Sequence, residues 1–159
     1  MQFRSQDLAG HPDIHELLDK CRWIHIDGEH SESAISNDLE VAARLLSANG
    51  VISIDDFMLH SYPHLTRAAF RFLDSRASDI SLFLYGFGKG YLCRPPAKHA
   101  YLSYIKESIF ADMAARGCAE ITIFKTNTPN ELNCFGIGPR FMDFDYYGLD
   151  ADQSAVVIK

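Results

Sequence analysis

Trp23-Ile24-His25-Ile26-Asp27-Gly28-Glu29-His30-Ser31 is the most informative stretch of this 159-residue chain. Its first four residues suit a β-strand, and Asp27-Gly28 marks the loop that follows. Ser31 or Ser33 can cap the helix that follows, in which apolar residues recur at helical spacing until Asn49-Gly50 ends it. Val51-Ile52-Ser53-Ile54 then has the character of a short buried strand. One helix between two strands predicts a parallel strand pair with a right-handed crossover.

The rest of the chain continues this alternation of helices and strands, which predicts an α/β fold. The glycine-rich segment 86–90 lacks the spacing of a phosphate-binding loop, so we interpret it as the turn of a hairpin. After residue 124 we expect loop, apart from a short final strand. The expected elements are strands at 2–5, 120–124 and 156–158, a hairpin at 81–94, and helices at 12–20, from 61 or 62 to about 73, and at 97–116.

Acidic residues follow both strands of the central unit. Asp27 and the pair Asp55-Asp56 each come directly after a strand, and the carboxyl ends of parallel strands share the sheet edge where ligands bind. At a separation of about 4 Å and an effective dielectric constant near 20, each pair of carboxylates repels by about 4 kcal/mol. Either one carboxyl group stays protonated, or a hard divalent cation such as Mg²⁺, Ca²⁺ or Mn²⁺ lies between them. Simple capping of the following helices is the alternative, and three acids together favour the cation.

Two histidines lie close to these acids in the sequence. His30 comes three residues after Asp27 in the same loop, where it could take a proton from a hydroxyl group near neutral pH. A surface position at the start of a helix is the other interpretation of His30. Glu29 is expected to face solvent or to cap the helix. His25 lies within the strand, and we expect it to be buried and hydrogen-bonded.

Composition excludes several classes of function. A net charge of −6 with no run of Lys or Arg argues against a nucleic-acid partner. The apolar runs are too short to span a membrane, and the segment Met1–Gln6 lacks the apolar stretch of a signal peptide, so we expect a cytoplasmic location. No pair among the four cysteines has zinc-site spacing, which favours free thiols.

The ordered combination of motifs resembles the class I S-adenosylmethionine (SAM) methyltransferases related to macrocin O-methyltransferase and the cephalosporin hydroxylase-like group. Their pattern reads roughly as hydrophobic-IDGxHxY, then DL, then LLxPGGxIxxDD. Residues 22–73 carry the resemblance, with Ala48-Asn49-Gly50 in place of Pro-Gly-Gly. Its matching pieces are the 23–31 stretch, Asn37-Asp38-Leu39, Leu45-Leu46 before Asn49-Gly50-Val51-Ile52, and Asp55-Asp56-Phe57.

The resemblance implies a metal-assisted O-methyltransferase. In that family the matching acids hold a divalent cation, which would make Asp27, Asp55 and Asp56 the ligands of Mg²⁺ or a similar ion. The matching histidine, His30, would be the general base, and the acceptor would be the hydroxyl group of a sugar or another small molecule. The implied fold is a partial Rossmann-like methyltransferase fold, with a mostly parallel sheet and a C-terminal hairpin but without the first strands.

The resemblance also implies an incomplete cofactor site. Such domains normally open with a strand, a GxGxG turn and a helix, and no GxGxG precedes Asp27. Gln6-Asp7 match the adenine-contacting turn, and with Asp27 they are the expected cofactor contacts, so the SAM site would be partial or lost. The whole chain, 1–159, would be one truncated domain whose hairpin, helix and tail span 80–159. Its strand at Trp23–Ile26 would form an exposed sheet edge that favours self-association.

Three interpretations of function remain at this stage. The chain could be a fragment of an O-methyltransferase, or a catalytically inactive remnant that binds a metal or a protein partner. A phospho-acceptor receiver domain also clusters three acids and a late lysine. Receivers place the acidic pair before the single aspartate, whereas here Asp27 precedes Asp55-Asp56, and Lys125 is the only candidate late lysine. The order therefore disfavours the receiver.

Overall fold

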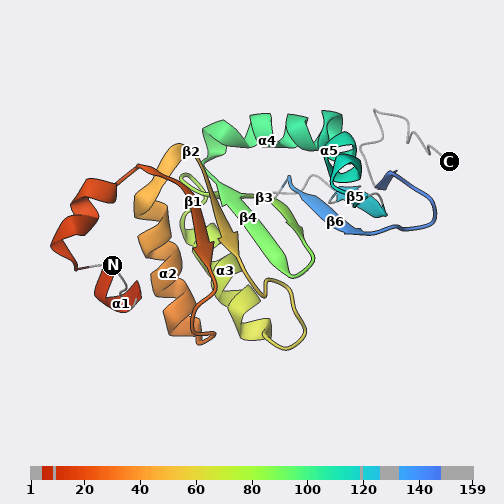
Figure 1. Ribbon diagram of the computed structural model, residues 1–159. Helices are drawn as coiled ribbons and strands as arrows, with labels where there is room; N and C mark the ends of the chain where they lie inside the picture. The colour runs from red at the N-terminus through yellow and green to blue at the C-terminus, as the bar shows by residue number, and fades with distance from the viewer. Residues whose placement is uncertain (1–4, 9, 119, 126–132, 148–159) are drawn as a thin grey trace.

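The structure is a computed structural model that describes residues 5–8, 10–118, 120–125 and 133–147. Within these ranges seven strands form one mixed sheet in the order β1-β2-β4-β3-β6-β5-β7, with helices packed on its faces (Figure 1). The predicted α/β fold is confirmed, and the arrangement is consistent with a Rossmann-like methyltransferase fold. None of the helices in the described ranges is long and apolar enough to cross a bilayer.

The central unit is β1 (Cys21–Ile26), α2 (Glu32–Leu45) and β2 (Leu46–Ile54). The two strands are parallel, as predicted, and their register pairs Trp23 with Val51 and Ile26 with Ile54. Ser31 caps α2, because its hydroxyl oxygen accepts a hydrogen bond from the Ala34 N–H at 3.3 Å. This register places Asp27 and Asp55 next to each other, because each follows directly after one of the two strands.

The predicted hairpin is confirmed as β3 (Ser81–Gly86) and β4 (Lys89–Cys93). Its turn is Phe87-Gly88, and both residues have positive φ angles, 50° and 72°, as a tight two-residue hairpin turn requires. Strand β4 also pairs antiparallel with β2. The glycine-rich segment is therefore a turn, and it carries Lys89 to the side of β2.

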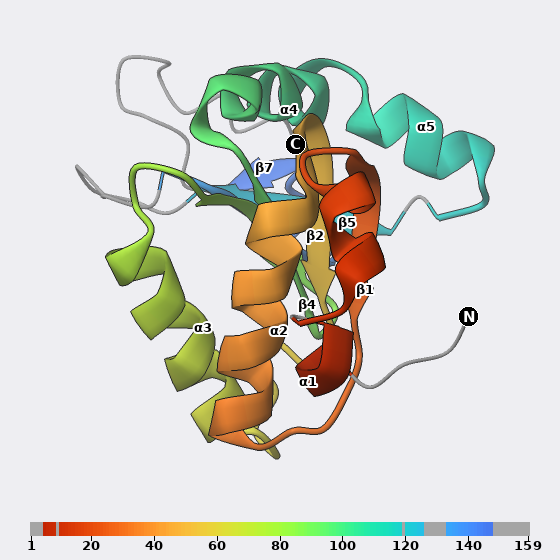
Figure 2. The ribbon, with the colours of Figure 1, turned by 90° about the vertical axis from the view of Figure 1, so that its left-hand side faces the viewer.

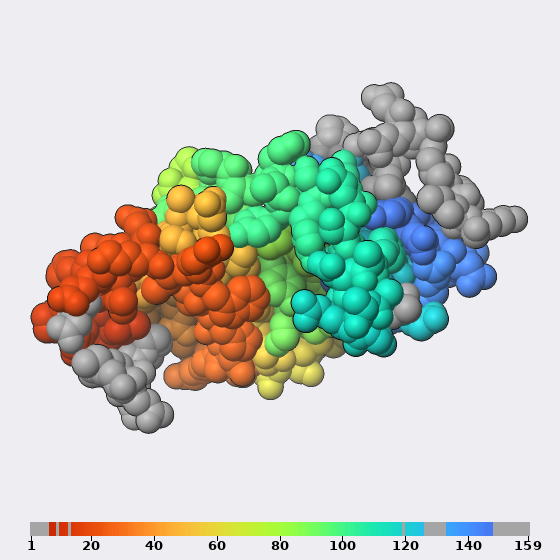
Figure 3. Space-filling model, turned by 45° about the horizontal axis from the view of Figure 1, so that its top comes forward, coloured from red at the N-terminus to blue at the C-terminus, as the bar shows by residue number. Residues whose placement is uncertain are grey.

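Helices cover the two faces of the sheet. The helices α2 and α3 (Pro63–Ser75) lie side by side on one face, over a core that includes Leu39, Ile52 and Leu65 (Figure 2). The helices α4 (Pro95–Glu107) and α5 (Ile109–Ala115), green to teal in Figure 3, cover the other face. Ile105 and Phe83 belong to the core cluster on that side. Each fully buried aliphatic side chain stabilises such a core by about 1.5–3 kcal/mol.

The predicted long helix at 97–116 is wrong in its continuity. It is divided at Ser108, whose φ and ψ angles of −129° and −20° leave the helical region, so α4 ends and α5 begins there. The predicted helix at 12–20 is a shorter 3₁₀ helix, η1 (Pro12–Leu17). An α-helical turn, α1 (Ser5–Leu8), begins at Ser5, where the expected strand at 2–5 would end; residues 2–4 lie outside the described ranges.

The C-terminal part of the sheet was predicted only in part. Strand β5 (Ile121–Lys125) agrees with prediction, but β6 (Phe135–Pro139) and β7 (Tyr146–Tyr147) occupy sequence expected to be loop. The sequence of β6, Phe-Gly-Ile-Gly-Pro, has low strand propensity. Its glycines fit because side chains of β3 and β5 crowd the backbone; a Cβ on Gly136 would lie 3.1 Å from the Tyr85 ring. The predicted strand at 156–158 lies outside the described residues.

All four cysteines are free thiols, as predicted. Burial raises the pKa of the Cys93 thiol to about 12, so that side chain stays protonated and acts as part of the core.

Candidate metal and acid–base site

The site lies where β1 and β2 end. Ile26 and Ile54 are the last paired residues of the two strands, so Asp27 and Asp55 begin neighbouring loops. The N–H of Asp55 donates a hydrogen bond to the Ile26 carbonyl oxygen at 2.9 Å, which ties the two strand ends together. The parallel pairing thus brings two of the three predicted acids side by side.

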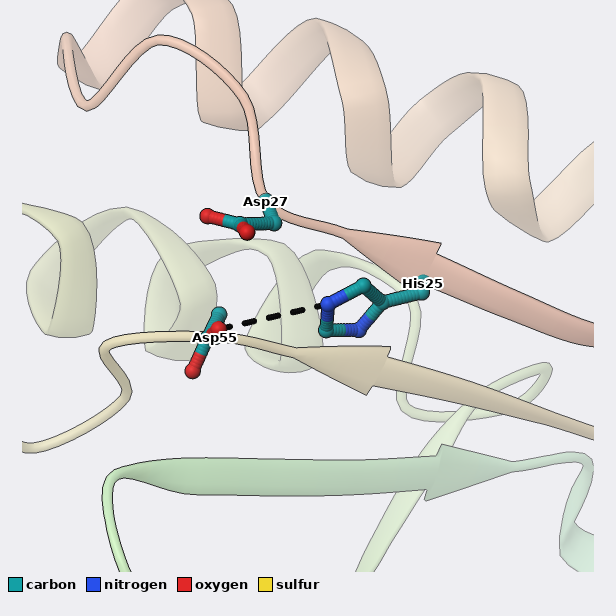
Figure 4. Close-up of side chains that lie close together, drawn as sticks. All are labelled: His25, Asp27 and Asp55. Atoms are coloured by element: carbon teal, nitrogen blue, oxygen red, sulfur yellow. Dashed lines mark ion pairs between the residues drawn. The ribbon is translucent and has the colours of Figure 1, made fainter.

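His25 joins these two carboxylates. It lies two residues before Asp27 on β1, and the three side chains converge between the strand ends (Figure 4). One potential ligand atom from each of His25, Asp27 and Asp55 lies within 4.8 Å of the other two. His25 Nε2 is 3.9 Å from Asp55 Oδ2. The side chain of His25 is 41% exposed, so the prediction that it is buried is wrong.

The composition of this cluster fits a divalent cation. Donors that each lie about 2.1 Å from an octahedral cation are about 3–4 Å from one another, a spacing these three side chains reach with small adjustments. Two carboxylates and one imidazole suit several divalent ions, since carboxylates bind Mg²⁺ and Mn²⁺ while imidazole binds transition metals. His25 was not predicted as a ligand; its place near the end of β1, two residues before Asp27, was the signal for it.

Lys89 is a fourth member of the site. Its Nζ, at the start of β4, lies 2.6 Å from Asp55 Oδ1. This hydrogen bond, assisted by the Asp56 N–H that donates to the same oxygen at 3.0 Å, holds the pKa of Asp55 below its ordinary value. The same hydrogen bond raises the pKa of Lys89. Near neutral pH, the site therefore contains a carboxylate paired with an ammonium group.

The third predicted acid, Asp56, turns toward His30. Its φ of 54° is in the left-handed region, so its side chain leaves the backbone in a different direction from that of Asp55. Asp56 Oδ2 lies 2.6 Å from His30 Nε2. The His30 ring also stacks on Tyr62, with ring centroids 4.3 Å apart, and the His64 Nε2–H donates to the His30 carbonyl oxygen at 2.7 Å. The predicted base is thus oriented by a carboxylate and an aromatic ring.

The two predicted adenine-contacting residues lie on another element. Gln6 and Asp7 belong to α1, which packs against α2, and the side chain of Asp7 is exposed. Asp27, the third predicted cofactor contact, is exposed within the acidic cluster. Their roles toward SAM stay predictions.

The comparisons with known proteins agree with this geometry. Residues 2–57 match a family described as "Methyltransferase domain". This range contains β1, α2 and β2, and it ends just after the Asp55-Asp56 pair. No curated protein matches the chain. The match covers about a third of the chain and, together with the α/β fold, supports a methyltransferase domain.

Proposed function

We propose that this chain forms the metal-binding and hydroxyl-activating part of a SAM-dependent O-methyltransferase of the type related to macrocin O-methyltransferase. The observation that carries the proposal is the placement of two acid–histidine groups at neighbouring strand ends, inside the segment that matches methyltransferase domains. The first group is His25, Asp27 and Asp55, and the second is His30 with Asp56. The acceptor is a small molecule with a hydroxyl group.

The first group is proposed to hold the cation. Asp27 and Asp55 supply carboxylate oxygens and His25 supplies an imidazole nitrogen. A bound Mg²⁺ or similar ion would polarise the acceptor hydroxyl and lower its pKa, and SAM would supply the methyl group. Asp56 remains a candidate third carboxylate, because it adjoins Asp55 in the chain, although its present partner is His30.

The second group is proposed to remove the proton. Asp56 holds His30 through Nε2, which leaves Nδ1 as the ring nitrogen that can accept a proton from the acceptor hydroxyl. The Asp56 carboxylate stabilises the imidazolium that forms, as the aspartate of an acid–histidine pair does in hydrolases. Stacking on Tyr62 restricts rotation of the ring, so that the base keeps one orientation.

A metal- or partner-binding module without catalysis is the second candidate. The observation that favours it is the Lys89–Asp55 ion pair, which compensates the charge of Asp55 without a cation. With this ion pair the charge of Asp55 is balanced without a bound cation, so a protein without catalytic activity could retain the site because the ion pair stabilises the fold.

Calorimetric titration of Mg²⁺ and of SAM into the full chain, followed by a transfer assay with tritiated SAM, separates the two candidates. The O-methyltransferase proposal expects Mg²⁺ binding that is lost in Asp27→Asn, and transfer that depends on Mg²⁺. Binding of both Mg²⁺ and SAM without transfer to any hydroxylated acceptor would favour the binding module. If Asp27→Asn binds Mg²⁺ as tightly as the wild-type chain does, this cluster does not bind the cation, and both candidate functions lose their metal site.

A further inference from the structure

A second feature of the molecule is an apolar pocket on the α4 face of the sheet. It has a volume of about 500 Å³ and lies between α4 and the strands β1, β2, β3 and β4. Its lining residues on α4 and α5 belong to the green-to-teal segment of Figure 3. Pockets of about 300–1,000 Å³ are typical of small-molecule sites. Five of the ten described residues that line the pocket are aromatic, namely Trp23, Phe83, Tyr91, Tyr101 and Tyr104.

The polarity of the lining favours a neutral ligand. Among the described residues that line the pocket, none is charged. Two of the tyrosine hydroxyls are already engaged, since Tyr101 donates to the Asn49 carbonyl oxygen at 2.8 Å and Tyr104 donates to Asp112. A charged ligand would lose its hydration there without receiving a charged partner, which is costly.

The arrangement of the rings favours a planar ligand. Phe83 and Tyr101 are stacked, with centroids 4.7 Å apart and an angle of 18° between their planes. Tyr91 lies 6.3 Å from both Phe83 and Trp23, so the rings continue across the strands to the sheet edge. Offset and edge-to-face contacts with such rings favour another aromatic ring over a flexible chain.

The pocket and the acidic cluster lie on the same face of the sheet. On β1, Trp23 of the pocket stands two residues before His25 of the cluster, and side chains two residues apart on a strand project from one face. Asp27 and Asp55 follow directly after the last residues of β1 and β2, so at about 3.3 Å per residue they lie roughly 13 Å along the chain from Trp23 and Val51. On β4, Tyr91 in the pocket follows Lys89 in the cluster by two residues. A ligand of two or three rings could reach from one to the other.

We propose that this pocket binds a neutral aromatic part of the acceptor, whose hydroxyl group then reaches the His25–Asp27–Asp55 cluster. The claim that the hydroxyl group reaches the cluster rests on the proposed function. The claim that an aromatic molecule occupies the pocket is independent of the proposed function. It narrows the acceptor from any hydroxylated small molecule to an aromatic compound or an aromatic glycoside.

The chain offers a direct probe, because Trp23 is its only tryptophan and lines the pocket. Titration with naphthalene is expected to change Trp23 emission in a saturable way, and glucose is expected to leave it unchanged. Ala100 lines the pocket and is exposed, so a ring in Ala100→Phe should occupy part of the pocket without disturbing the core. This variant is expected to bind naphthalene at least about tenfold more weakly. The same substitution at exposed Ala114 on α5, Ala114→Phe, should leave the affinity unchanged.

The outcomes separate this inference from the proposed function. The pocket assignment is overturned if naphthalene causes no saturable change in Trp23 emission, or if Ala100→Phe binds naphthalene as tightly as the wild-type chain. Either result holds independently of Mg²⁺ binding. If Trp23 emission depends on protein concentration and naphthalene leaves it unaltered, a second copy of the chain fills the pocket, which also overturns it. The link to the cluster is tested with 2-naphthol, whose affinity should rise when Mg²⁺ is present while that of naphthalene does not. If Mg²⁺ changes the affinities for naphthalene and 2-naphthol equally, the pocket is not linked to the cluster. The metal role of the cluster is then decided by the Mg²⁺ titrations alone.

Discussion

Lys89 Nζ lies 2.6 Å from Asp55 Oδ1, so an ammonium group from the hairpin occupies one carboxylate of the candidate metal site. A divalent cation that binds Asp55 must compete with this ion pair. The sheet order explains the contact, because β4 pairs with β2 and Gly90 stands opposite Ile54, which leaves Lys89 beside Asp55.

Replacing Lys89 with Met should strengthen Mg²⁺ binding. The variant keeps the length of the side chain but removes the charge that competes for Asp55, so we expect the dissociation constant to fall by about three- to tenfold, the range of a partly exposed ion pair. Calorimetric titration at constant ionic strength measures it. Lys20→Met, at an exposed lysine, is the control. Equal or weaker Mg²⁺ binding in Lys89→Met would show that the ion pair does not compete with the cation.

The same ion pair should make stability depend on pH in the acid range. The pKa of Asp55 is lowered in the folded chain, so its contribution is present above the ordinary value of 3.8 and is lost as pH falls through the folded pKa. The pKa of Lys89 is raised, so its contribution is complete below 10.5 and is lost only as pH rises through the higher folded value. Urea denaturation should therefore show wild type more stable than Lys89→Met by about 0.5–1 kcal/mol at pH 7, and by less at pH 3. A difference that grows on acidification would contradict this sign.

Loss of the Asp55 charge should weaken metal binding directly. In Asp55→Asn the amide keeps the shape of the side chain but offers only a neutral oxygen, so we expect Mg²⁺ affinity to fall at least about tenfold. Asp79→Asn is the matched control, because Asp79 is also an aspartate in an ion pair, with Arg76, away from the strand ends. Unchanged Mg²⁺ affinity in Asp55→Asn, measured in the same titration, would show that the cluster does not bind the cation.

The sequence was sufficient for the β1–α2–β2 unit because that unit is local. Strand propensity and helical spacing together predict a parallel pair, and the pair alone brings Asp27 and Asp55 to one sheet edge. The predicted helix end at Asn49-Gly50 is wrong, because α2 ends at Leu45 and Asn49-Gly50 lies inside β2. The hairpin at β3 and β4 was equally local, since its turn residues stand next to both strands.

The features that were missed depend on contacts between distant segments. Lys89 reaches Asp55 only because β4 pairs with β2, and the sequence of the hairpin does not indicate which strand it pairs with. His25 is exposed because β1 stands at the end of the strand order, where less of the chain covers it. Strand β6 has low intrinsic propensity and is held by pairing with β3 and β5.

The edge of the sheet at β1 should promote self-association. Among the described strands β1 has a partner on one side only, and Trp23 is 60% exposed on it. Such an edge favours pairing with a second copy, and a charge at position 23 opposes it. Trp23→Lys should raise the dissociation constant for self-association at least about tenfold in sedimentation equilibrium. Phe87→Lys, at a hairpin-tip residue that is 59% exposed, should not. A wild-type chain that stays monomeric at high concentration would contradict the prediction.

His30 should affect chemistry more than binding. Its ring is held by Asp56 at 2.6 Å and by stacking on Tyr62, in an arrangement that orients a base and leaves Nδ1 to accept a proton. His30→Gln removes the base while retaining a polar side chain, and general-base catalysis is worth about 10²–10⁴-fold, so transfer from tritiated SAM to 2-naphthol should fall by at least about 10²-fold. SAM affinity should change by less than about twofold, because in this proposal His30 acts on the acceptor rather than on SAM.

Two further measurements distinguish a base from a structural histidine at this position. Asp56→Asn should also slow transfer, since it removes the group that orients His30. His60→Gln, at an exposed histidine in the loop after β2, should leave transfer and SAM affinity unchanged. If His30→Gln lost SAM binding in proportion to its activity, His30 would be a binding residue, and the base would have to be sought elsewhere along this sheet edge.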